Sequence, residues 1–350
     1  MPFNTLLAGL AALVLLLPGP AARAQTSPAP SDPGLVHAAE SEGTVVWYTG
    51  LIVNQIARPL VEAFQQKYPA IRVQYARASN TETALKILNE ARARRVQVDV
   101  FDVTSGIFPL LEAKVVAPYA PHAAANYPTE YRDKDGYWTA SNLYFLTVAA
   151  NTNLVGPEAM PRGFDGLLDP KWKNQMAWTS ELAVQGPPGF IHNMLTLYGQ
   201  EKGMDYLRRF AAQQPVAVAA SPRTVLDQVI AGEHQLGVMM YNHHVAISAA
   251  QGAPVRGLKL EPLVEIFTMF GIAKDAPHPN AARLFEEFVL SEEGQRVFAA
   301  NDYLPADPAV PAKTPELKPD AGHFRTDVIT PAMERDELPR WQAIYRDLFR

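Results

Sequence analysis

Short apolar segments typical of buried strands alternate with amphipathic helical segments along most of this chain. Residues 44–48 (TVVWY) are predicted to form a strand, and Ile56, Leu60, Phe64 and Tyr68 follow at the spacing of one helical face. Strands that alternate with helices pair in parallel and are covered by helices on both faces. The alternation therefore predicts an α/β fold.

The alternation occurs in two series that are separated by a long extended segment. Further strands are predicted at residues 71–75, 98–101, 176–178, 215–219 and 236–240, and helices at residues 81–95, 105–113, 188–198, 204–212, 222–231, 244–251, 280–289 and 338–348. The two series predict two lobes, with a ligand cleft where the carboxyl ends of their strands face each other.

Two apolar extended runs, residues 144–150 (YFLTVAA) and 263–273, are interpreted as strands that cross between the lobes. They are expected to act as a hinge near Leu146 and Phe267. The expected division assigns residues 36–146 and 268–310 to lobe 1, and residues 147–267 and 311–350 to lobe 2.

The first 24 residues have the layout of an export signal. Residues 6–17 are apolar apart from one glycine, and residues 22–24 (ARA) form a small-residue cleavage site after which we expect cleavage, at Ala24. The apolar run is shorter than the roughly 20 residues of a membrane-spanning helix. The alternative, an apolar first helix of the fold, would show a polar face. Residues 25–35 are rich in Pro and Ser and are predicted to be a flexible linker.

The composition restricts the location and the partners of the chain. The chain has no Cys, so we expect neither disulfides nor a lipid anchor, because lipoproteins are acylated on a Cys. We therefore expect a soluble periplasmic protein, and a monomer. The net charge of −5 argues against nucleic acid and anionic membranes as partners.

Polar side chains follow the predicted strands at the ends where ligands bind in open α/β sheets. Helix N-termini at these ends could donate amides to an anion, and Arg77 could add a charge-assisted contact. The alternatives are ordinary helix caps for the Ser, Thr and Asn side chains, a solvated surface arginine and, for Tyr48, a core tyrosine. The candidate ligand-binding residues are Tyr48, Thr49, Arg77, Ser79, Asn80, Thr104, Ser105, Thr179, Ser180, Tyr241, Asn242 and His243.

The densest cluster is residues 241–244 (YNHH), whose phenol, amide and imidazoles can bind a polar ligand or a transition metal. Adjacent histidines at one helix start point in different directions, which argues against a dedicated metal site. The other histidines are scattered along the chain and are assigned no chemistry. The acid pairs Glu286-Glu287 and Glu292-Glu293 are interpreted as solvated helix faces.

Enzyme motifs are missing from the sequence, including G-x-S-x-G, H-E-x-x-H, G-x-G-x-x-G and the P-loop. We therefore expect a binding protein and no catalytic residues. The alternative is an exported α/β hydrolase, which would need His243 or His244 hydrogen-bonded to Ser105 or Ser180. A metal chaperone or sensor that uses the paired histidines is a third hypothesis.

Several segments resemble the periplasmic solute-binding proteins of ABC importers, in the branch that includes the ferric-iron-binding proteins. The resemblance is carried by VVWYTG (45–50), FQQKYPAIRV (64–73), VDVFD (98–102), NTNLV (151–155), LLDPKWKNQMAW (167–178), VLDQVIAGEHQLGVMMYN (225–242), GIAKDAPHPNAARLFEEFVLSEEGQ (271–295) and YLPADP (303–308). It covers nearly all of the chain after the leader. It implies the type II-like periplasmic-binding-protein fold, whose two lobes close on a ligand and dock on an inner-membrane ABC permease.

Most of the residues that bind iron in the resembled family have no equivalent at the matching positions of this sequence. The iron-binding members hold Fe(III) with two adjacent tyrosines, a His, an acidic residue and an anion. Residues 241–243 contain one tyrosine, the His position falls near Leu51 or Ile52, and the acidic position falls near Thr104. As possible metal ligands there remain Tyr241 and His243, with Tyr48, Asp102 and Glu181 close enough to be considered.

This departure favours relatives that bind organic anions such as phosphonates, sugar phosphates or thiamine. Fe(III) as cargo is the alternative ligand, and no cofactor is expected. The resemblance thus implies a substrate-binding component that captures a small organic anion by closure of its lobes.

Overall fold

The structure, a computed structural model, describes residue 1, residues 32–319 and residues 322–349. The predicted signal peptide, its cleavage site and most of the predicted linker lie outside the described residues. Helix α1 (Pro33–Glu42) begins within residues 25–35, where the linker was expected, because Asp32 caps it and Pro33 occupies its first turn. None of the described helices is long and apolar enough to cross a membrane.

The strands and helices follow the expected alternation. The strands are β1 (Thr44–Thr49), β2 (Arg72–Arg77), β3 (Val100–Val103), β4 (Val116–Ala117), β5 (Thr139–Asn151), β6 (Met176–Thr179), β7 (Val216–Val218), β8 (Leu236–Tyr241), β9 (Val255–Leu258), β10 (Leu263–Ala273), β11 (Leu304–Pro305) and β12 (Thr326–Val328). The helices after α1 are α2 (Arg58–Lys67), α3 (Asn80–Arg92), α4 (Ile107–Glu112), α5 (Pro187–Tyr198), α6 (Gln200–Ala211), α7 (Pro222–Ala231), α8 (Asn242–Ala250), α9 (Pro279–Leu290), α10 (Glu292–Ala300) and α11 (Pro331–Leu348).

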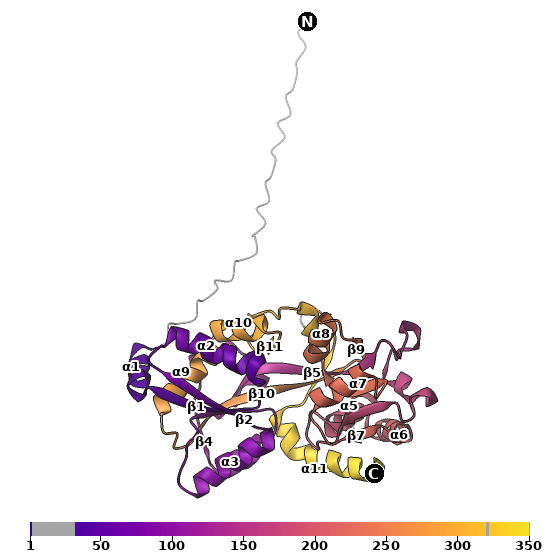
Figure 1. Cartoon of the computed structure of the whole chain (residues 1–350), viewed down its shortest axis with the longest axis horizontal. Coiled ribbons are helices and arrows are strands. Elements are labelled where there is room, and N and C mark those ends of the chain that lie inside the picture. Colours follow the sequence, from indigo (N-terminus) through magenta and orange to yellow (C-terminus); the bar gives the residue numbers. More distant parts are fainter. Residues whose placement is uncertain (2–31, 320–321, 350) are drawn as a thin grey trace.

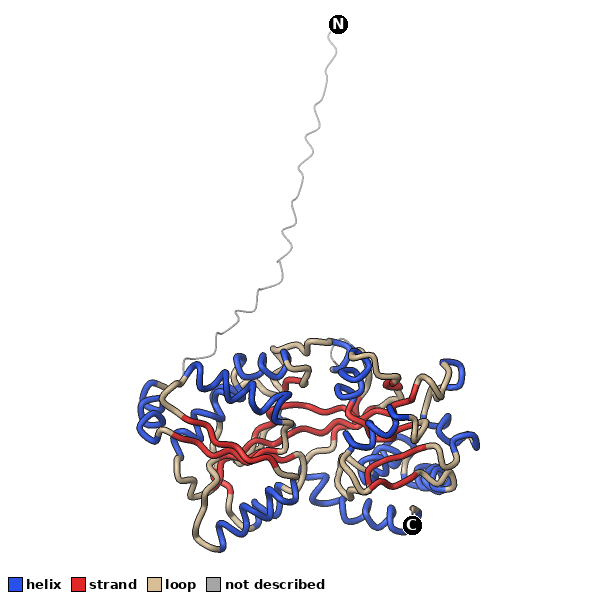
Figure 2. Tube along the Cα trace, in the orientation of Figure 1, coloured by secondary structure: helices blue, strands red, loops and turns tan. Residues whose placement is uncertain are grey.

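One continuous sheet runs through the molecule in the order β2-β1-β3-β10-β5-β8-β6-β7. Figure 1 shows β1, β2, α1, α2 and α9 on one side, β7, α5 and α6 on the other, and β5 and β10 between them. In Figure 2 the long central strands connect the two sides. The fold is therefore a two-lobe α/β architecture.

The central strands correct the expectation that the sheets are parallel throughout. Strands β1, β2 and β3 pair in parallel, as do β6, β7 and β8. Strand β10 runs antiparallel to β3 and β5, and β5 runs antiparallel to β8. The reason is that the chain passes between the lobes along β5 and returns along β10, so the two directions are opposite.

The crossing strands are buried along their whole length, as their apolar sequences require. Every residue of β5 and of β10 is buried. The position at which one lobe ends and the other begins within these strands stays a prediction.

Aromatic side chains form much of the core of each lobe. In the first lobe the ring of Phe285 lies 5.4 Å from Trp47 and 5.0 Å from Phe64, measured between centroids. In the second lobe the Phe210 ring lies 5.6 Å from Trp178 and 4.7 Å from Phe190.

The acid pair on α9 is buried and not solvated as expected. Glu286 is 2 % exposed and Glu287 is 8 % exposed. The Glu287 carboxylate accepts hydrogen bonds from the backbone amides of His122 and Ala123, which shows that the 119–124 segment covers this face of α9. Burial and the neighbouring Glu287 raise the pKa of Glu286 well above its usual value.

Three of the scattered histidines have acidic partners, one of which is His122, whose Nδ1 atom lies 3.4 Å from Glu287. The His278 Nδ1 atom lies 2.9 Å from Asp99, and the His192 Nε2 atom lies 3.1 Å from Asp327. These partners were not visible in the sequence because they are far apart along the chain.

Candidate ligand-binding cleft

A cavity of about 370 Å³ lies between the two lobes. It is lined by the segments that follow β1, β2 and β3 in the first lobe and β6, β7 and β8 in the second. These are the carboxyl ends of parallel strands, where open α/β sheets bind their ligands. The volume lies in the range of roughly 300–1,000 Å³ that is usual for small-molecule sites.

The first-lobe wall carries a fixed polar rim. The Asn80 side chain donates to Thr104 Oγ1 at 2.7 Å and accepts from the Thr104 backbone amide at 3.0 Å, which joins the ends of β2 and β3. The Arg77 Nε atom donates to the Gly50 carbonyl at 3.4 Å. No carboxylate of the described residues forms an ion pair with Arg77, so its guanidinium can meet an anionic ligand.

The start of α3 is closed by a capping box. Ser79 accepts from the Glu82 amide, and the Glu82 carboxylate accepts from both the amide and the hydroxyl of Ser79. These bonds lower the pKa of Glu82. Ser79 therefore serves as a helix cap while it lines the cavity, and a negative charge already sits at this helix N-terminus.

Asp102 forms part of the floor of the cleft. Its carboxylate accepts from the Trp47 indole at 2.8 Å and from the Gly50 amide at 3.0 Å, so it fixes the turn after β1. Complete burial raises its pKa to about 6, against hydrogen bonds that lower it.

Three tyrosines form a wall that the sequence did not predict as a set. The Tyr144 ring lies 4.8 Å from Tyr241 and 6.4 Å from Tyr303, and all three line the cavity. Burial raises the pKa of Tyr144 to about 12 and raises that of Tyr241 well above its usual value. The wall thus offers neutral hydroxyls and aromatic faces at neutral pH.

The two adjacent histidines are buried beside this wall. His244 is 5 % exposed and lines the cavity, whereas His243 is completely buried with its ring 5.4 Å from Tyr144. Burial lowers the pKa of His244 to about 3 and lowers that of His243 well below its usual value, so both rings are neutral. Among the described residues none forms a hydrogen bond with either ring.

The second-lobe wall supplies one acidic and one basic side chain. Glu181 accepts from the Gln185 amide at 3.0 Å. Arg223 is held by Asp227 and donates to the Ser248 hydroxyl at 3.0 Å. Both residues line the cavity, so the two lobes present charges of both signs to the cleft.

The structure brings together part of the predicted site. The cavity is lined by Arg77, Ser79, Asn80, Thr104 and Tyr241. It is also lined by Gly50, Tyr144, Gln185, Arg223, His244 and Tyr303, which were not among the candidates. Tyr144 was hidden in an apolar crossing strand, and Tyr303 lies beside an irregular Pro-rich segment.

The remaining candidates lie outside the cavity lining. The Tyr48 hydroxyl donates to Glu90, and Lys86 lies over its ring, because alternate residues of β1 face opposite sides of the sheet. Thr49 accepts from the Leu51 amide, and Thr179 donates to the Ala220 carbonyl. The cavity lining also does not include four further candidates, which are Ser105, Ser180, Asn242 and His243.

The described residues show neither the hydrolase pairing nor a cluster of metal-binding His, Asp and Glu side chains. Neither His243 nor His244 is hydrogen-bonded to Ser105 or Ser180, the pairing that a hydrolase would need. In the part of the chain that the structure describes, no group of three or more His, Asp or Glu side chains could hold a metal ion.

Comparisons with known proteins agree with the fold. A family model described as bacterial extracellular solute-binding protein matches residues 99–326. The Fe(3+)-binding periplasmic protein of Serratia marcescens is 20 % identical over 272 residues, which cover 76 % of this chain and 79 % of that protein.

Two solved structures illustrate the range of relatives. The fructose-6-phosphate-bound periplasmic binding protein AfuA of Actinobacillus pleuropneumoniae matches with a TM-score of 0.72 and 22 % identity, over 88 % of this chain and 98 % of that chain. Iron-bound HitA of Pseudomonas aeruginosa matches with a TM-score of 0.71 and 22 % identity, over 87 % of this chain and 99 % of that chain. Similar folds thus hold different ligands.

Proposed function

The chain belongs to the bacterial extracellular solute-binding protein family, and from this we propose that its cleft captures a small hydroxyl-bearing organic anion, such as a sugar phosphate. As a periplasmic substrate-binding component of an ABC importer, the protein would close its lobes on this solute and deliver it to an inner-membrane permease. In this proposal the protein acts as a monomer after removal of the signal peptide near Ala24.

The observation that carries the proposal is the Arg77 guanidinium, which faces the cavity without a carboxylate partner among the described residues. An anionic group can bind there and accept further hydrogen bonds from the rim at Asn80 and Thr104. The cavity of about 370 Å³ suits a small molecule better than a bare ion.

The rest of the lining explains why the anion should also carry hydroxyl groups. Glu181 and Asp102 can accept hydrogen bonds from a ligand, and both would repel a second negative charge. The ring faces of Tyr144 and Tyr241 can pack against the carbon skeleton of a sugar. A fructose 6-phosphate complex of the similar AfuA supports this choice of ligand class.

Ferric iron is the second candidate, and the wall of three tyrosines favours it. Fe(III) prefers phenolate oxygen, and its charge lowers the pKa of a bound tyrosine. The ligands would be Tyr144, Tyr241, Tyr303 and His244, whereas His243 lies behind Tyr144 and outside the cavity lining. The names of the Serratia and Pseudomonas relatives support iron as cargo.

The test is isothermal titration calorimetry of the purified protein with fructose 6-phosphate, inorganic phosphate and ferric citrate. The Arg77→Ala variant should weaken fructose 6-phosphate binding about tenfold or more, because a charge-assisted contact is lost. The exposed Arg92, in the same lobe, provides the matched control as Arg92→Ala.

The outcomes separate the two ligands. A visible absorbance band with ferric citrate that disappears in Tyr241→Phe and persists in Arg77→Ala would establish iron and reject the organic anion. Native mass spectrometry of the purified protein gives an independent reading, since a copurified organic mass in a colourless protein would reject iron.

A further inference from the structure

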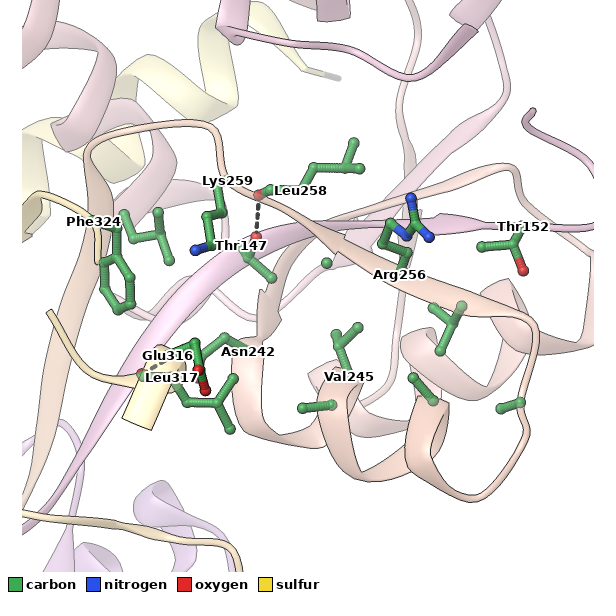
Figure 3. Close-up of a pocket in the computed structure, with 16 residues that line it drawn as sticks. Thr147, Thr152, Asn242, Val245, Arg256, Leu258, Lys259, Glu316, Leu317 and Phe324 are labelled. Carbon is green, nitrogen blue, oxygen red and sulfur yellow. Dashed lines mark hydrogen bonds between the residues drawn. The ribbon is translucent and has the colours of Figure 1, made fainter. Parts of the chain in front are cut away.

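A second cavity, of about 500 Å³, lies on the other side of α8 from the cleft. We call it the back cavity; Figure 3 shows the residues that line it, which come from β5, α8, β9, the start of β10 and the described residues Glu316, Leu317 and Phe324. The first turn of α8 separates the two cavities. Tyr241 and His244 line the cleft, whereas Asn242 and Val245 line the back cavity.

The back cavity combines apolar walls with opposite charges. Val245, Leu263 and Phe324 are buried apolar residues of its lining. Lys259 and Glu316 are both exposed, and neither forms an ion pair with any described residue. Figure 3 places Lys259 on the side of β9 and Glu316 with Asn242 on the opposite side.

Asn242 fixes the wall of the back cavity on the side of Glu316. Its side-chain amide donates to the Leu317 carbonyl at 2.8 Å, which holds this wall segment beside α8. Its Oδ1 atom has almost no accessible surface, so the Glu316 carboxylate is the acceptor that this wall offers to a ligand.

We propose that the back cavity binds a small amphipathic zwitterion, an α-amino acid with an apolar side chain. The ligand carboxylate contacts Lys259, and its ammonium group donates to Glu316. The apolar side chain packs against Val245, Leu263 and Phe324, and the volume lies within the usual range for such ligands.

Ligands with a single charge fit the lining less well. A carboxylate with an apolar tail would satisfy Lys259 but would leave Glu316 unpaired. An apolar amine would satisfy Glu316 but would leave the Lys259 ammonium unpaired. Arg256, which also belongs to the lining, increases the preference for a ligand that carries a carboxylate.

The experiment is isothermal titration calorimetry of the full chain with L-leucine and L-phenylalanine as probes. Isovalerate and phenethylamine are the matched probes that keep the apolar group and one charge each. We expect saturable binding of an amino acid, and binding about tenfold weaker or more for each probe with one charge.

The variants Lys259→Met and Glu316→Gln should each weaken amino acid binding about tenfold and leave the melting temperature unchanged, because both side chains are exposed. Lys202→Met, at an exposed position of α6, is the control and should bind like the wild type. Arg77→Ala should also bind like the wild type, since Arg77 belongs to the cleft.

Four results would overturn the proposal. The first two are the absence of saturable binding for both amino acids and binding that persists in both Lys259→Met and Glu316→Gln. The third is binding lost in Arg77→Ala, which would place the ligand in the cleft. The fourth is isovalerate bound as tightly as leucine, which would reject the zwitterion as the ligand class. The outcome does not depend on which solute the cleft takes.

Discussion

Glu334 is a buried carboxyl group at the start of α11, where this helix meets the start of α4 in the first lobe. It is 7 % exposed, and its one hydrogen bond with a described residue comes from the Gly106 amide at 3.4 Å. Desolvation raises its pKa from 4.5 to about 7. The carboxyl therefore stays protonated in the folded state over a pH range in which it ionises in the unfolded chain.

We predict that Glu334→Gln stabilises the protein at pH 8 relative to the wild type. The stability that the neutral carboxyl contributes is fully present below pH 4.5 and is lost as the pH rises through about 7. The gain at pH 8 should reach about 3 kcal/mol and should shrink towards pH 5. Urea unfolding at both pH values measures it.

The control for this prediction is Glu112→Gln, at an exposed position of α4. It should change the free energy of unfolding little at either pH. A gain for Glu334→Gln that is equal at pH 5 and pH 8 would mean that packing, and not titration, causes the effect.

The cleft residues that the sequence could predict are those that end strands. Arg77 ends β2, Asn80 and Thr104 follow β2 and β3, and a rule about sheet edges is enough to find them. Tyr144 and Tyr303 could not be found in this way, because one lies inside an apolar crossing strand and the other reaches the cleft from a distant segment. The same rule wrongly placed Tyr48 in the cleft. Tyr48 lies one position before the end of β1, so its side chain faces away from the cleft.

Helix α5 begins with a turn that has no room for a side chain. A Cβ atom on Gly189 would lie 2.0 Å from the Val184 carbonyl oxygen and 2.9 Å from the methyl group of Met239. We predict that Gly189→Ala destabilises the protein by about 1–3 kcal/mol or more, because the backbone must move. Thermal or urea unfolding measures the loss.

Gly156→Ala, just before the short 3-10 turn Pro157–Ala159 and outside α5, is the control substitution. A Cβ atom there meets nothing within 4 Å, and the backbone φ of −66° suits any residue. It should be neutral or stabilising by a few tenths of a kcal/mol to about 1 kcal/mol. Equal destabilisation by both substitutions would contradict the steric argument.

At the scale of elements, periodicity predicted the strands and helices well where the local pattern was strong. Residues 263–273 are both the predicted and the observed strand β10. Helix α11 begins at Pro331, before the predicted start at residue 338. Pro339 therefore lies inside the helix and not in its first turn. The antiparallel direction of β5 and β10 depends on which strands become neighbours, and no local pattern carries that information.

At the scale of the whole molecule, the hinge role predicted for the crossing strands β5 and β10 can be tested by measuring whether the lobes approach each other. The cleft lies between the lobes, with Ala78 on the first-lobe side and Glu181 on the second. The chain has no Cys, so a pair of introduced thiols can report the approach of the lobes without interference. A disulfide needs the two Cα atoms within about 7 Å of each other.

We predict that the double variant Ala78→Cys, Glu181→Cys forms an intramolecular disulfide under mild oxidation, because hinge motion at β5 and β10 brings the lobes together. Titration of free thiols with Ellman's reagent measures its formation. The pair Ala78→Cys, Lys202→Cys should keep its thiols, since α6 lies at the far end of the second lobe in Figure 1. Closure by the disulfide should also abolish binding of fructose 6-phosphate or ferric citrate, whichever the cleft takes, and reduction should return binding to the level of the same variant before oxidation. Thiols that stay free in the cleft pair would mean that the lobes do not close.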